Sequence, residues 1–300
     1  MLTAWAILAD GLIYASWLFL IAAGLTVIYG VMRILNLAHG AFYALGAYTA
    51  ATAIGWYYGG SGDTHMLVSY LLLGGCALVA GALLGAAVER GVLRIMYGRD
   101  EILMLIVTFA LLLILDDAMK LIWGTQSYLP YQPYAEMGRM NFDGLSVAYY
   151  DVTLIAISLL VGLGLWYWLE RTHTGKILRS IIHDREVSAA MGVNVKRMFT
   201  ITFMIGAGLG AAAGGLTAPA ISVAPGLGAE VIVVAFAVVV SGGLGSIGGA
   251  AIGAIAVGLA RAASVHLAPE LELFVIYAVM ATVLIFRPHG LFGQATARKI

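Results

Sequence analysis

Polar residues gather at one point of an apolar stretch, in RILNLAHG, where Arg33, Asn36 and His39 stand within seven residues. In a membrane protein such side chains usually face the protein interior, a water-filled cavity or an interface. Arg33 suits an anchor at the membrane surface, whereas Asn36 could cap the next helix and Gly40 permits close packing or a bend. We predict that Asn36, His39 and Gly40 form a structured break at the permeation or gating region, since broken helices recur in membrane transport. A local capping and packing role is the competing interpretation.

Two carboxylates near the end of the fourth apolar run, Asp116 and Asp117, precede Lys120 by four and three residues. That spacing on a helix favours an ion pair, here at the membrane interface. A cation or proton site would need desolvated carboxylates at greater depth.

Glycines crowd the segment SGGLGSIGGA, residues 241–250. Its GxGxxG pattern is no dinucleotide site, because an apolar run follows in place of a soluble crossover helix. Nor is Ser246 the nucleophile of a hydrolase, because Leu244 stands where the GxSxG motif needs glycine. Glycine weakens helices and lets backbones approach, so we predict either close packing or a translocation and gating element. Its residues are Gly242, Gly243, Gly245, Ser246 and Gly248.

The pair Gly175 and Lys176 is not a phosphate-binding loop, because Glu170 and Ile177 replace the required glycine and hydroxyl residue. We therefore expect no ATP, cofactor or metal in this chain, no catalytic residues and no enzymatic activity.

The most basic loop, residues 170–198, holds six of the sixteen Lys and Arg residues. Within it, REVSAAM favours a helix that Asp184 can cap and that a glycine can stop. A plain solvated loop is one interpretation, and a short helix that docks into a groove of another protein is the other. The docking residues would be Arg185, Glu186, Ala189, Ala190, Gly192, Val193 and Asn194.

The composition places these groups in a membrane protein. The chain has 300 residues, 62% hydrophobic and 11% charged, with no net charge and a mean hydropathy of +0.96. Soluble domains carry roughly 25% charged residues. The single Cys76 excludes an intramolecular disulfide, and the N-terminus lacks the basic region and cleavage site of a signal peptide. We expect one all-α transmembrane domain over residues 1–300, which contacts membrane lipid and binds no nucleic acid.

Seven apolar runs are about the 20 residues that a membrane span needs. They lie near 11–32, 38–58, 66–88, 102–122, 151–169, 199–219 and 270–286. Residues 227–265 are too long for one crossing and short for two, and their glycines suggest two short spans or a re-entrant pair. Small residues recur every four positions at Gly206, Gly210 and Gly214, which favours close helix packing.

Lys and Arg concentrate on the cytoplasmic side. If Arg33, the loops 89–101 and 170–198, and the C-terminal tail lie there, thirteen of the sixteen basic residues are inside. The three left outside are Lys120, Arg139 and Arg261. Because the tail with Arg298 and Lys299 is then inside, residues 227–265 must cross an even number of times. The result is about eight to nine segments, with the N-terminus outside and the C-terminus inside.

Four stretches resemble the permease subunits of branched-chain amino acid ABC importers, the LivH type. They are ILNLAHGAFYALGAY, LIVTFALLLILDDAMKLIWG, EVSAAMGVN with TFMIGAGLGAAAGG, and AFAVVVSGGLGSIGGAAIGA. They occur in order over nearly the whole chain, and together they are specific. The resemblance implies a fold similar to type II ABC importer permeases in a bacterial inner membrane.

It also implies partners: a second permease chain, two cytoplasmic ATPases that hold ATP and Mg²⁺, and a periplasmic substrate-binding protein. The family's ATPase-coupling element corresponds to Glu186, Ala189, Ala190 and Gly192. The substrate implied is an amino acid or a related small amphiphile, with urea, short amides and aromatic or dicarboxylic acids left open. A stand-alone ion- or proton-coupled transporter that uses Asp116, Asp117 or His39 is the alternative.

Overall fold

The computed structural model describes residues 2–60, 65–142 and 145–292. Most of these residues lie in helices, which confirms the helical membrane fold. Seven of the described helices are long and apolar enough to span a membrane. They are α1 (Leu2–Met32), the continuous helix Met66–Met96, α6 (Glu101–Trp123), α8 (Tyr149–Arg171), α11 (Val195–Thr217), α13 (Ile247–Leu267) and α14 (Glu272–Phe286). A 3₁₀ turn lengthens the span of α11 to Ala220, and another begins the span of α14 at Pro269.

Two further apolar helices complete the bundle. α2 (His39–Gly60) has 22 residues, many of them glycine and tyrosine, and α12 (Leu227–Gly242) has 16. The segment 227–265 therefore forms two helices, α12 and α13, that part at residues 243–246. The predicted eight to nine segments are reached only when α2 and α12 are counted with the seven.

Some predicted boundaries are wrong. α1 begins at Leu2, well before residue 11, and the helix predicted to end at residue 88 continues to Met96. That helix runs through α3 (Met66–Tyr70), α4 (Ala77–Val88) and α5 (Arg94–Met96). Two π-helical turns join these parts, η1 (Leu71–Cys76) and η2 (Glu89–Leu93). Residues 89–96 are thus helix and not loop, and π turns of this kind are frequent at functional sites.

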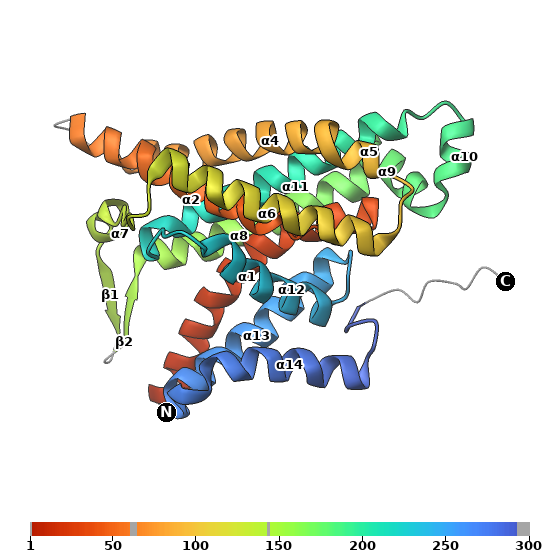
Figure 1. The fold of residues 1–300 in the computed structure, drawn as a ribbon. Coiled ribbons are helices and arrows are strands. Elements are labelled where there is room, and N and C mark those ends of the chain that lie inside the picture. Colours follow the sequence, from red (N-terminus) through yellow and green to blue (C-terminus); the bar gives the residue numbers. More distant parts are fainter. Residues whose placement is uncertain (1, 61–64, 143–144, 293–300) are drawn as a thin grey trace.

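α1 and α11 form the centre of the molecule. In each, 78% of the residues in an apolar stretch of 18 are buried, against 22% in α6, 17% in α8 and 6% in the span of α14. Figure 1 shows α14 along one edge of the bundle and α1 crossing its middle. Helices that are apolar on every side yet exposed in the isolated chain suit a membrane environment.

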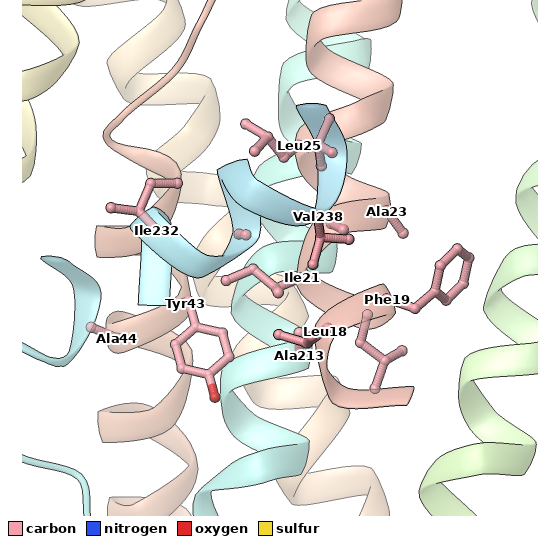
Figure 2. Packing of buried hydrophobic residues seen from close by; sticks show 14 of the residues in the cluster. Leu18, Phe19, Ile21, Ala23, Leu25, Tyr43, Ala44, Ala213, Ile232 and Val238 are labelled. Carbon is pink, nitrogen blue, oxygen red and sulfur yellow. The ribbon is translucent and has the colours of Figure 1, made fainter. Parts of the chain in front are cut away.

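Glycines and alanines bring the central helices into contact, as their spacing predicts. A methyl group on Gly206, Gly210 or Gly214 of α11 would overlap atoms of α1 or α2. Larger side chains close the gaps, and Figure 2 shows this cluster with Ile21 and Leu25 of α1, Tyr43 of α2, and Ile232 and Val238 of α12. The cluster joins the N-terminal helices α1 and α2 to α11 and α12, which lie in the second half of the sequence.

The bundle has two distinct ends (Figure 1). The basic end carries Arg33 and the helices α9 (His173–His183) and α10 (Arg185–Ala190). The hairpin end carries the helical turns α7 (Gln132–Glu136), η3 (Ala218–Ala220) and η4 (Pro269–Leu271), with a small sheet. In that sheet β1 (Arg139–Phe142) pairs antiparallel with β2 (Leu145–Ala148), with Arg139 opposite Ala148. This hairpin is a local exception to the all-α prediction.

Candidate functional site

The chain breaks between α1 and α2, as RILNLAHG predicts. Arg33 has a φ of 55°, which among the described non-glycine residues is the sole left-handed backbone conformation. Residues 33–38 are then fixed by a side chain of α6. The N–H of Leu37 donates to Thr108 Oγ1 over 3.3 Å, and Thr108 Oγ1 donates to the carbonyl of Leu35 over 3.2 Å. The break is therefore an ordered structure, and Thr108 is a member that sequence reasoning missed.

The break leads into the middle of the bundle. Trp123 Nε1 donates to Thr52 Oγ1 over 2.7 Å, which puts the end of α6 level with Thr52. Gly40 lies twelve residues before Thr52, which is about 18 Å along α2. Because α6 is about 34 Å long, Gly40 is only about halfway along α6 from Trp123. His39 likewise touches Ile21, about 16 Å along α1 from Met32. α2 thus begins near mid-depth and not at the basic end.

Asn36 does not cap α2, so that prediction is wrong. Its side chain is fully buried, and neither carboxamide atom has a hydrogen-bond partner among the described residues. The N–H of His39 instead bonds to the backbone carbonyl of Asn36. Buried polar groups are paired in the great majority of cases, so an unpaired carboxamide is a feature that needs a reason.

His39 lies where α1, α2 and α11 meet, with no exposed surface. Its Nε2 lies 3.1 Å from the carbonyl oxygen of Ile21, which can only accept, so the proton is on Nε2. A methyl group on Gly210 would lie 2.6 Å from the ring, so glycine makes the room that the imidazole fills. Gly40 packs directly on Gly228 of α12. Gly40 therefore serves close packing.

α12 covers only part of the depth of the bundle. It starts beside Gly40 at mid-depth and runs about 24 Å to the basic end, where Gly245 lies against Gly30 of α1. Asp116 Oδ1 accepts a 3.1 Å bond from the N–H of Gly226, just before α12. An acidic group there complements the positive end of the helix dipole.

The glycine segment forms a tight turn between α12 and α13. Gly243 and Gly245 have φ angles of 110° and 84°, which favour glycine. Ser246 Oγ accepts a 3.0 Å bond from the N–H of Gly249 and so caps α13. A methyl group on Gly242 would overlap the backbone of Gly249. Gly248, by contrast, has open space around it.

The segment after α14 closes this turn, a contact that no sequence pattern indicated. The N–H groups of Leu291 and Phe292 donate to the carbonyls of Ser241 and Gly242, each over 2.9 Å. Gly290, with a φ of 77°, sits against Gly243. The C-terminal segment thus supplies donors to carbonyls that the end of α12 leaves free. Arg298 and Lys299 lie outside the described residues.

The basic loop forms the predicted short helix. Asp184 Oδ1 caps α10 by accepting from the N–H groups of Glu186 and Val187, over 2.9 and 3.0 Å. Gly192, with a φ of 88°, ends it, and Asn194 caps α11 through a 3.0 Å bond from the N–H of Arg197. Arg185, Glu186, Ala189 and Ala190 are exposed and Val193 is half-buried.

A hollow of about 350 Å³ lies beside the contact between α9 and α10. It is lined by Ser180, His183, Asp184, Val187, Ser188, Met191 and Val193. Met191 is 81% exposed and Val187 54%, although this loop lies outside the helices that could span a membrane. The exposed face of α10 is therefore partly apolar.

A buried acid lies behind this loop, in η2. Glu89 has no exposed surface and receives hydrogen bonds from Arg94, Tyr97 and Thr200. Burial, and then the hydrogen bond to Glu89, raises the pKa of the Tyr97 phenol, so it stays a donor at physiological pH. We refer to Glu89, Arg94, Tyr97 and Thr200 as the Glu89 cluster.

Comparison with known proteins decides the class. A family model described as the permease component of the branched-chain amino acid transport system matches residues 7–284. The chain belongs to this permease family. BraD of Pseudomonas aeruginosa, a high-affinity branched-chain amino acid transport system permease protein, is 29% identical over 98% of this chain and 97% of its own length. LivH of Escherichia coli K12, with the same description, is 28% identical over 97% and 96%.

A more distant relative of this permease is also similar over nearly its whole length. A probable branched-chain amino acid transport permease protein LivH of Methanocaldococcus jannaschii is 26% identical over 96% of this chain and 92% of its own. Among solved structures, PsaBC from Streptococcus pneumoniae in complex with Fab covers 92% of the permease and 89% of its own chain. Its TM-score is 0.48 and its identity 12%.

The carboxylates on α6 of the permease form the ion pair that their spacing predicts. Lys120 Nζ lies 2.8 Å from Asp116 Oδ2 and 3.0 Å from Asp117 Oδ1. Since Asp116 also accepts from Gly226, it has a structural partner on each side.

Proposed function

We propose that this chain is the membrane permease subunit of a binding-protein-dependent ABC importer, which moves branched-chain or related amino acids across a bacterial inner membrane. The family match over residues 7–284, on a bundle of apolar helices, carries this proposal. The substrate class follows from the names of BraD and LivH.

The same proposal includes the partners and the orientation. We assign a second, different permease chain, two cytoplasmic ATP-binding subunits and a periplasmic substrate-binding protein. The N-terminus is periplasmic and the C-terminus cytoplasmic, so that α9 and α10 face the ATPases. α10 suits that contact because it is exposed, is capped by Asp184 and shows apolar Val187 and Met191 outside the spans.

We assign gating to α12 and its two ends. Asn36, His39 and Gly40 lie at its start through the contact of Gly40 with Gly228, and the 242–248 turn lies at its end against Gly30. Glycine contacts have no interlocking side chains, so a helix can slide there between two packings. ATP-driven displacement of α10 then shifts α11 and α12 between inward-open and outward-open arrangements.

The competing function, a stand-alone ion-coupled transporter, has weaker support. Asp116 and Asp117 are paired with Lys120, and Asp116 is also bonded to Gly226. A carboxylate with such partners is poorly suited to exchange a cation or proton during transport. Vesicles that contain this chain alone are expected to show no uptake.

A substitution at Gly192 tests the coupling role. Valine is strained at a φ of 88°, whereas asparagine tolerates this conformation. In proteoliposomes with all partners, we expect Gly192→Val to lower amino acid uptake at least about fivefold while membrane insertion and ATP hydrolysis persist. Gly192→Asn is expected to retain uptake. Normal uptake by Gly192→Val would contradict the assignment of α10 as the element that couples to the ATPases.

A further inference from the structure

The Glu89 cluster is built into a distorted helix. η2 inserts a π turn over Glu89–Leu93, after α4. With this turn, Arg94 Nη2 lies 3.2 Å from Glu89 Oε2 although the residues are five apart, and Tyr97 reaches the same carboxylate from eight residues away. Regular α-helical neighbours are three and four residues apart. The π turn therefore gathers donors that a regular helix would separate.

The carboxylate joins two helices that are distant in sequence. Tyr97 donates to Glu89 Oε1 over 2.7 Å, and Thr200 Oγ1, in the second turn of α11, lies 2.7 Å from Glu89 Oε2. Arg94 Nη2 also donates to Thr200 Oγ1 over 2.6 Å. Burying a carboxylate is costly unless such partners surround it.

Aromatic rings connect the cluster to α10. Tyr97 packs edge-on against Phe199 with ring centroids 5.3 Å apart. The Arg185 guanidinium carbon lies 5.1 Å from the Phe199 ring centroid on the α10 side. A continuous path of contacts thus runs from Arg185 through Phe199 and Tyr97 to Glu89.

We propose that Glu89 is a positioning residue that makes α10, the start of α11 and the Met66–Met96 helix move as one body. This inference rests on the proposed function, since α10 must be the segment that the ATPases push. α4 and α11 are also in close contact at Gly81 and Gly85, where added methyl groups would crowd Ala211 and Ala207. α11 then passes the displacement to α1 and α2 across Gly206 and Gly214.

The test compares amino acid uptake with ATP hydrolysed in proteoliposomes of the full complex. Glu89→Gln keeps the shape of the side chain but removes its charge, and Thr200→Val removes the hydroxyl at constant shape. We expect both to assemble with the ATPases and to lower uptake per ATP at least about fivefold. Thr200→Ser, which keeps the hydroxyl, is expected to restore the wild-type ratio.

Glu170→Gln is the matched control, because Glu170 pairs with Arg179 at the surface of the basic loop, outside the Glu89 cluster. It should leave uptake per ATP unchanged. If Glu89→Gln does not accumulate, Tyr97→Phe, which keeps the ring on Phe199, is measured in its place. An unchanged ratio in the variants that assemble would overturn the inference. Failure of the wild-type chain to assemble with any ATPase would instead overturn the proposed function.

Discussion

At the residue scale, single glycines decide how closely the central helices approach. A methyl group on Gly46 would overlap the carbonyl of Ala211, whereas one on Gly55, in the same helix, meets nothing within 4 Å. Overpacking a tight contact destabilises a protein by about 1–3 kcal/mol. A glycine that lies free in a helix gains up to about 1 kcal/mol on change to alanine.

We therefore expect Gly46→Ala and Gly55→Ala to act in opposite directions. Gly46→Ala should lower the midpoint of thermal unfolding in detergent, and Gly55→Ala should leave it unchanged or raise it. Equal effects of the two variants would contradict the helix contact between α2 and α11.

At Asn36, one substitution is expected to affect stability and transport differently. Replacing a buried, unpaired carboxamide by an apolar side chain removes an unfavourable desolvation. We expect Asn36→Leu to hold or raise the unfolding midpoint and to lower amino acid uptake by the complex, because gating loses its polar group. Asn141→Leu, in the exposed strand β1, is the control for the change of residue type. Full uptake by Asn36→Leu would contradict a role of Asn36 in gating.

At the element scale, α12 depends on the C-terminal segment to complete its end. The N–H of Leu291 donates to the Ser241 carbonyl, and proline at that position cannot donate. One lost hydrogen bond is worth about 1 kcal/mol. We expect Leu291→Pro to speed amide hydrogen exchange in the last turn of α12 about fivefold, as seen by mass spectrometry. Leu291→Val, which keeps the N–H, should exchange as the wild type does.

Short-range elements were predictable because their signals are local. Asp184 and Gly192 bound a helix of six residues, and Lys120 follows two aspartates at helical spacing. The Glu89 cluster was missed because the charges after residue 88 resemble an ordinary basic loop. The five-residue spacing of Glu89 and Arg94 has meaning only once the π turn is known.

At the scale of the whole molecule, the apolar runs in the sequence predicted most helices of the bundle. They did not predict the depth at which each helix begins. Hydropathy counts residues along the chain, whereas the start of α2 beside Ile21 and of α12 beside Gly40 is a property of tertiary packing. The same limit applies to α1, whose first turns from Leu2 extend a span expected at residue 11. Hydropathy and charge therefore predicted the class of fold, and RILNLAHG indicated a break, but the depth at which α2 and α12 begin could not be predicted.

Orientation is the property on which the coupling mechanism depends, and the two ends of the bundle allow a direct measurement. After Cys76→Ala, single cysteines at Met191 and Leu271 mark the basic and hairpin ends, since these side chains are 81% and 47% exposed. The excess of Lys and Arg at the basic end predicts that this end lies in the cytoplasm. A membrane-impermeant maleimide should then label Leu271→Cys in intact cells, but Met191→Cys only after the membrane is opened. Labelling of Met191→Cys in intact cells would show that α10 lies on the periplasmic side, where it could not contact a cytoplasmic ATPase.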